Sequence, residues 1–177
     1  MTRLFALLAA AGLAMPLSAA ELNDRYGAMG TMTVSLGGET LEMVIPHDRE
    51  KDRGYAEQKM IMGSFLTINT VGRVVDDTGT PGRPMVQVTL QKRSGEMALI
   101  SAEVFDEQGF DAPLAMGADG GQGALTAFEM GDDNTVTATV EGNFLRLTGY
   151  TSEPRVADGA TPVPSTINWT VTLPPLE

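Results

Sequence analysis

The sequence predicts an all-β protein, a single antiparallel β-sandwich of about eight or nine strands, with a closed up-and-down β-barrel as the alternative. Apolar and polar residues alternate with a period of two along most of the chain, as they do in half-buried strands. Clusters of glycine, asparagine and aspartate separate the alternating segments, as turn residues do. Evidence for helix is confined to residues 55–62, where residues 60–62 also continue the strand pattern.

A hairpin over residues 31–45 is the clearest single element. Apolar and polar side chains alternate on both sides of Gly37-Gly38, a glycine pair that can take the positive φ angles of a two-residue turn. A turn at this pair places Met32 opposite Met43 and leaves one face of the hairpin apolar and the other polar. This arrangement is what a strand pair covering a core requires.

The middle of the chain predicts three more strands. Residues 64–75 form one long strand in which Gly72 marks a bulge. Residues 85–91 and 98–105 form a pair with Gly95 in the connecting loop. The side chains expected to face inward are Leu66, Ile68, Val74, Val86, Val88, Leu90, Ala98, Ile100, Ala102 and Val104.

Residues 125–150 are predicted to form a three-strand meander. The first turn lies at residues 131–134 and the second at Gly142-Asn143, a turn dipeptide. A turn at the second site places Val140 opposite Leu145.

The last predicted strand covers residues 166–173, where Ile167 and Trp169 alternate with polar residues. The long connection from about residue 149 to 166 favours a sandwich, because it can return the chain across one end of the fold. We therefore expect the last strand to lie beside a strand distant in sequence, with Trp169 buried between the sheets. The loops expected to carry contacts are residues 46–53, 76–83, 116–123 and 151–165.

The first segment of the chain has the pattern of a secretory signal peptide. Arg3 provides a basic start, residues 4–15 form an apolar run too short to span a bilayer, and residues 18–20 are small, as a cleavage site requires. The sequence thus predicts a signal peptide over residues 1–20 and a single all-β domain over residues 21–177, working in the periplasm or outside the cell. The chain has no cysteine, which excludes a thiol nucleophile and a thiolate metal site.

The net charge of the chain limits the classes of partner that are expected. Residues 1–20 contain one charged side chain, so residues 21–177 carry 11 basic and 23 acidic side chains, a net charge of −12. Such a surface repels phosphate groups, which argues against a nucleic-acid partner. Residues 21–177 have no apolar stretch long enough for a membrane-spanning helix, so no membrane span is expected.

His47 is the single histidine, and it lies in a charged segment over residues 46–53. A general base oriented by Asp48 is one interpretation, but adjacent loop residues seldom hold that geometry, and the chain has no G-x-S-x-G motif. We interpret the segment as a solvated charged loop. Any pair of carboxylates could meet for hydrolysis, but no spacing favours a particular pair.

Metal sites have only fragments of their usual patterns. Asp119, Asp132 and Asp133 lie in segments that resemble pieces of calcium loops, although the full EF-hand pattern is absent. The spacings Met29-x-x-Met32 and Met60-x-Met62 are ones that Cu(I) can use, but methionine also fills gaps in cores. No cofactor is predicted.

The function expected from these observations is an exported, non-catalytic binding or interaction module with an unknown protein or small-molecule partner. A β-barrel that carries a small apolar ligand is the first alternative. A β domain that binds a divalent cation is the second, and an unrecognised hydrolase is the third. The interior is expected to separate the first two, because a carrier needs a cavity and a surface binder does not.

Overall fold

The computed structural model describes residues 21–117 and 119–176, so the predicted signal peptide lies outside the described residues. Within them the chain is all-β and contains no helix, and its strands join one antiparallel sheet of 12 strands. The strands are β1 (Tyr26–Leu36), β2 (Glu39–Asp48), β3 (Arg53–Gly54), β4 (Ala56–Ile61), β5 (Phe65–Val75), β6 (Pro81–Arg93), β7 (Glu96–Phe105), β8 (Leu114–Gly117), β9 (Gly123–Met130), β10 (Thr135–Thr148), β11 (Arg155–Val156) and β12 (Val163–Thr172). The predicted fold class is confirmed, and the strands beyond the predicted number are mainly the short β3, β8 and β11.

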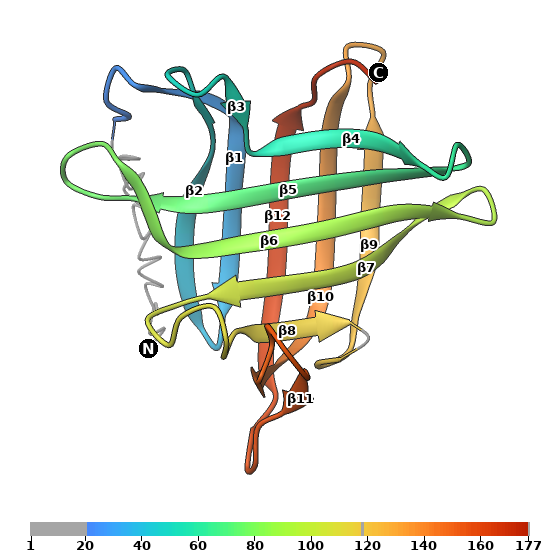
Figure 1. Ribbon diagram of the computed structural model, residues 1–177. Helices are drawn as coiled ribbons and strands as arrows, with labels where there is room; N and C mark the ends of the chain where they lie inside the picture. The colour runs from blue at the N-terminus through green and yellow to red at the C-terminus, as the bar shows by residue number, and fades with distance from the viewer. Residues whose placement is uncertain (1–20, 118, 177) are drawn as a thin grey trace, which may run out of the picture.

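The sheet folds into two layers whose strands cross one another (Figure 1). The layer at the back of Figure 1, called the back layer, contains β3, β2, β1, β12, β10 and β9. The layer in front of it, called the front layer, contains β8, β7, β6, β5 and β4. The layers are continuous at two corners, where Val44 of β2 pairs with Arg73 of β5 and Leu145 of β10 pairs with Ala115 of β8. The result is an orthogonal sandwich with the closed corners of a flattened barrel.

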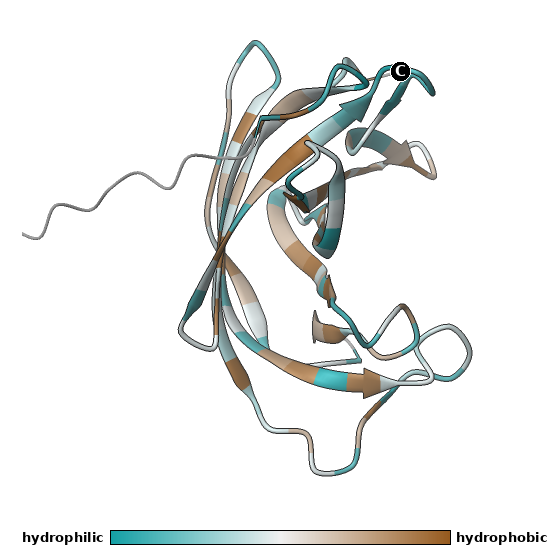
Figure 2. Cartoon of the chain, turned by 90° about the vertical axis from the view of Figure 1, so that its left-hand side faces the viewer, coloured by the Kyte–Doolittle hydropathy of each residue, from teal (hydrophilic) through white to brown (hydrophobic). Residues whose placement is uncertain are grey.

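The core lies between the two layers. Apolar and hydrophilic residues alternate along the strands (Figure 2), and the apolar set faces inward. The largest fully buried side chains of this core come from both layers: Phe144, Met32, Ile45, Ile68, Leu90, Met116 and Ile167. Burial of each such side chain contributes about 1.5–3 kcal/mol to the stability of the fold. Burial of this shared core is therefore the main interaction that holds the two layers together.

The predicted hairpin at residues 31–45 is confirmed as β1 and β2. Met32 pairs with Met43, as the glycine turn requires, and both side chains are buried. Gly37 and Gly38 have φ angles of 60° and 95°, which glycine adopts at little cost.

The predicted turn at Gly142-Asn143 is wrong, because β10 runs without interruption through it. Val140 pairs with Leu125 of β9 and with Ile167 of β12, not with Leu145. A Cβ atom at Gly142 would lie 2.2 Å from the carbonyl oxygen of Gln122. The glycine therefore permits close approach of a neighbouring backbone, and the strand continues from the back layer into its pairing with β8.

Two inward assignments on β7 are also wrong. A register shift between Thr89 and Leu90 of β6 pairs Leu90 with Leu99. Leu99 and Met97 therefore pack against the core in place of Ala98 and Ile100. Such a bulge moves every following side chain to the other face of the sheet.

The bulge predicted at Gly72 lies slightly further along the strand, because the register shift falls between Arg73 and Val75. Gly72 itself has another role. A Cβ atom at Gly72 would lie 2.6 Å from the sulfur of Met32 and 3.3 Å from that of Met43. The absent side chain thus makes room for the two methionines of the opposite layer.

The predicted position of the last strand, beside a strand distant in sequence, is confirmed. β12 lies between β1 and β10, and Trp169 is buried between the layers. Residues 56–61, left open between helix and strand, form β4. The loops predicted at residues 46–53 and 151–165 are shorter than expected, because β2 extends to Asp48 and β12 begins at Val163.

Candidate functional site

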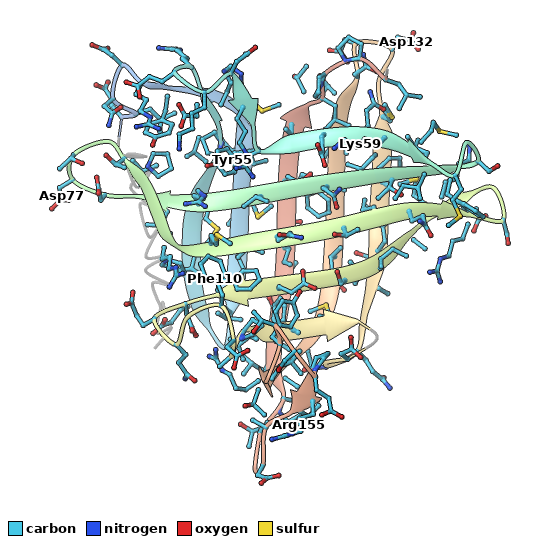
Figure 3. The ribbon with its side chains drawn as sticks, in the orientation of Figure 1. Tyr55, Lys59, Asp77, Phe110, Asp132 and Arg155 are labelled. Atoms are coloured by element: carbon cyan, nitrogen blue, oxygen red, sulfur yellow. The ribbon has the colours of Figure 1, made fainter. Side chains whose placement is uncertain are left out.

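The three predicted metal-ligand candidates do not come together. Asp119 precedes β9, whereas Asp132 and Asp133 follow it, so the full length of the strand separates them, about 27 Å. Figure 3 shows Asp132 at the tip of the β9–β10 turn. The carboxylate of Asp133 accepts hydrogen bonds from the backbone N–H and the hydroxyl of Thr135, both at 2.9 Å, which stabilises the turn. Among the described residues, no group of three His, Cys, Asp or Glu side chains could hold a metal ion.

His47 lies on β2 and faces Asp52, with 3.3 Å between its Nε2 and the carboxylate. Both groups line a wide depression of about 700 Å³ beside Tyr55. The guanidinium of Arg73 lies 4.9 Å from the centre of the Tyr55 ring, so this aromatic face is already covered by a cation. The described residues that line the depression include no serine, threonine or cysteine, so a histidine–aspartate pair is present without a neighbouring nucleophile of these types.

The paired methionine spacings do not converge either. Met32 is buried in the core, whereas Met29 packs against Gly54. Met62 is 89% exposed at the tip of the β4–β5 turn, and Met60 lies on the preceding strand. Met29 falls at the register shift between Ala28 and Gly30, and its side chain packs at the edge of the core rather than in its centre.

A buried acid lies on the outer side of the front layer. Glu103 of β7 is only 5% exposed, and its Oε2 atom has no hydrogen-bond partner. Burial raises the pKa of Glu103, and the hydroxyls of Ser101 and Tyr150 partly offset this effect. Burial and the charge of Glu103 raise the pKa of Tyr150 to about 12.

The loop after β7 and the loop after β10 cover this acid and form a small second core. Phe105 packs against Phe110 and Tyr150, with ring centres 5.2 and 5.8 Å apart. Arg146 of β10 forms a two-pronged ion pair with Asp106 and ties the loop after β7 to the back layer. Side chains of the protein itself therefore enclose Glu103, and we interpret it as a buried structural residue.

An open groove of about 620 Å³ lies at one corner of the sandwich. Its apolar walls come from Met60 and Leu66 on one layer and Met130 on the other, with Phe65 and Leu176 at the rim. It is therefore the mouth between the two layers, and we call it the mouth groove.

The topology explains why this corner is open. β4 ends the front layer, and β9 pairs only with β10 within the part of the chain that the structure describes. The hairpins β4–β5 and β6–β7 extend past β9 on the right of Figure 1. Because no strand joins β4 to β9, the inward faces of both layers remain accessible here.

Exposed apolar side chains concentrate at the same corner. The described residues include eight large apolar side chains that are exposed, and six of them lie in the β4–β5 hairpin or on the groove wall: Met60, Ile61, Met62, Phe65, Met130 and Leu176. Soluble proteins rarely leave such side chains together without a binding role.

The polar groups of the mouth groove are few. Gln58 is buried and donates hydrogen bonds to the Asn134 side chain at 3.3 Å and to the Pro174 carbonyl at 2.8 Å. Among the described residues that line the groove, Lys92 is the single charged one.

The sequence pattern does not predict this groove. Residues 60–62 continue strand alternation, and Met130 ends another predicted strand. The available signal was the apolar residues on both sides of Gly63-Ser64, at 60–62 and 65–66, because polar residues are usual around a turn.

Comparisons with known proteins give no further assignment. No family model, no curated protein and no solved structure matches the chain. No helix of the described residues is both long and apolar enough to cross a bilayer. The chemistry of the mouth groove therefore provides the basis for a functional proposal.

Proposed function

We propose that this chain is an exported, non-catalytic binding module that holds a small, largely apolar molecule in the mouth groove. The concentration of exposed apolar side chains around an open groove is the observation that supports this function. A pocket with apolar walls and a few polar groups is the usual form of a small-molecule site. The export component rests on the signal-peptide pattern of residues 1–20.

This proposal combines the predicted binding module with the predicted carrier. The centre of the sandwich is filled by its own side chains, such as Phe144 and Trp169, so a ligand is better accommodated at the corner. Methionine suits such a role because its thioether is flexible and polarisable and adapts to different shapes. Met60 and Met130 would then contact the ligand from opposite layers.

Binding of N-phenyl-1-naphthylamine, an uncharged apolar fluorophore, tests this function. We expect a fluorescence increase that saturates with the full-length processed protein. The double variant Met60→Ser/Met130→Ser is expected to weaken binding by roughly thirtyfold, because each methionine contributes roughly 1 kcal/mol of apolar contact. The matched control is Val156→Ser, since Val156 is as exposed as Met60, at 41%, but lies on β11.

Three outcomes would contradict the proposal. The first is an unchanged affinity in the double variant, and the second is an equal loss in Val156→Ser. The third is a stable dimer that covers these side chains and excludes the fluorophore, which sedimentation velocity would detect. Thermal unfolding curves for every variant establish that each one is folded.

A further inference from the structure

We propose that the mouth groove selects amphiphiles with one anionic group, and that the ammonium group of Lys92 binds that group. This inference rests on the proposed function and names its ligand class: an apolar body with a carboxylate or another single anionic head. The position of Lys92 supports it, as do two observations on the described residues: Lys92 has no ion-pair partner among them, and those that line the groove include no acid.

Lys92 continues the inward-facing row of β6. Val88 and Leu90 precede it at alternate positions and are buried in the core. Lys92 pairs with Met97 of β7, whose side chain packs against the core. The lysine stem therefore begins on the apolar inner surface, and its charge lies where that surface meets solvent.

Lys92 forms no ion pair with any described residue. The ion pairs of the described residues join Arg25 with Asp48 and Glu50, His47 with Asp52, Lys59 with Glu57, and Arg146 with Asp106. The described residues that line the groove include no aspartate or glutamate. The chain as a whole has 23 acidic and 12 basic side chains, so the charge of the described groove lining is opposite in sign to that of the average surface.

Of two acids near the rim, one is held by another residue and one lies on the other face of its strand pair. The carboxylate of Asp133 is held by Thr135. Glu96 pairs in register with Arg93, the neighbour of Lys92 on the other side of the strand. An anionic head at Lys92 would therefore meet a cation that is paired with no described carboxylate, while the apolar body lies against Met60 and Met130.

Displacement of bound N-phenyl-1-naphthylamine by dodecanoate and by methyl dodecanoate, both below the concentrations at which they self-associate, tests the inference. The two molecules share an apolar chain, but only dodecanoate is charged. We expect the wild-type protein to prefer dodecanoate by roughly fivefold, the upper range for a solvent-exposed ion pair. Lys92→Met should abolish the preference and leave methyl dodecanoate binding within about twofold, since methionine retains an apolar stem. Lys92→Arg should retain the preference.

The matched control is Lys59→Met. Lys59 lies on β4 and is paired with Glu57 at 2.7 Å on the outer side of that strand (Figure 3), so this variant should retain the full preference. Equal binding of both amphiphiles by the wild type, or a preference that survives in Lys92→Met, would overturn the inference while the proposed function stands. A wild-type protein that fails to bind the fluorophore would overturn the proposed function itself.

Discussion

At the scale of single residues, Glu103 is a buried acid whose environment opposes its ionisation. Its carboxyl group is almost fully buried, and one oxygen has no hydrogen-bond partner. Desolvation favours its neutral form, which is why its pKa is raised. The unfolded chain returns this group to water, where it ionises near its ordinary pKa of 4.5. Glu103 therefore links folding to pH.

Glu103→Gln should stabilise the protein at pH 8 and have little effect near pH 4. A pKa raised by folding provides stability below the unfolded pKa, and this stability is lost as the pH rises through the folded pKa. The uncharged amide avoids that loss, so we expect a gain in the free energy of unfolding of up to about 2 kcal/mol at pH 8. Urea unfolding at both pH values, followed by Trp169 fluorescence, measures the difference.

The exposed acid Glu129 of β9 provides the control, because Glu129→Gln changes the same charge without burial. An equal loss of stability in Glu103→Gln at both pH values would contradict the prediction. It would show that the carboxylate is a needed hydrogen-bond acceptor for Ser101 and Tyr150.

At the scale of elements, β10 connects the two layers, and Gly142 is the position that permits this. Gly142 pairs with Gly123 of β9 on one side and with Ser165 of β12 on the other. Beyond it, Leu145 pairs with Ala115 of β8 in the front layer. A side chain at residue 142 would collide with backbone atoms, which cannot rotate away as a flexible side chain can.

Gly142→Ala is expected to lower the free energy of unfolding by about 1–3 kcal/mol, the usual cost of forcing an extra group into a packed site. Gly82→Ala is the control, because its Cβ would have no atom nearer than 3.9 Å, and it should change stability by less than about 0.5 kcal/mol. Urea titration measures both. Similar small effects in the two variants would contradict the close contact of β9 and β10 at Gly142.

The same element shows what local sequence patterns can predict. The β1–β2 register follows from alternation and a glycine turn, both of which are local, and Met32 lies opposite Met43 as expected. Gly142-Asn143 has the same local signal, but its glycine serves a contact with residues 122–123 on another strand. Turn glycines and contact glycines are indistinguishable without the fold. The bulge that turns Leu99 inward has the same cause, since it depends on pairing with β6.

At the scale of the whole molecule, the mouth groove could not be predicted because it arises from an unpaired corner. Alternation identifies the inward face of β6 but not which strand edges stay apart, and a register shift on β9 turns Met130 inward against the simple alternation from Leu125. Lys92 was not a candidate, since a lysine after an apolar row usually marks the end of a strand. Its position on a groove wall depends on the crossing of the two layers.

The net charge of −12 for residues 21–177 also acts at this scale, and it opposes the local attraction of Lys92 for an anion. The repulsion acts over long distances and is screened when the Debye length falls from about 30 Å at 0.01 M salt to about 8 Å at 0.15 M. Contact between the ammonium and the anionic head acts over a few ångströms and is screened less. Approach and retention of the ligand should therefore respond differently to salt.

We expect the association rate of a fluorescent long-chain carboxylate to rise roughly twofold to fivefold between these salt concentrations, because screening removes the repulsion that slows the encounter. The dissociation rate should change by less than about twofold, since it depends on short-range contacts. Stopped-flow fluorescence separates the two rates. The methyl ester of the same molecule is the control, and its association rate should stay nearly constant because it carries no charge. An association rate for the carboxylate that falls with salt would mean that the local field of Lys92 outweighs the charge of the whole surface, contrary to this prediction.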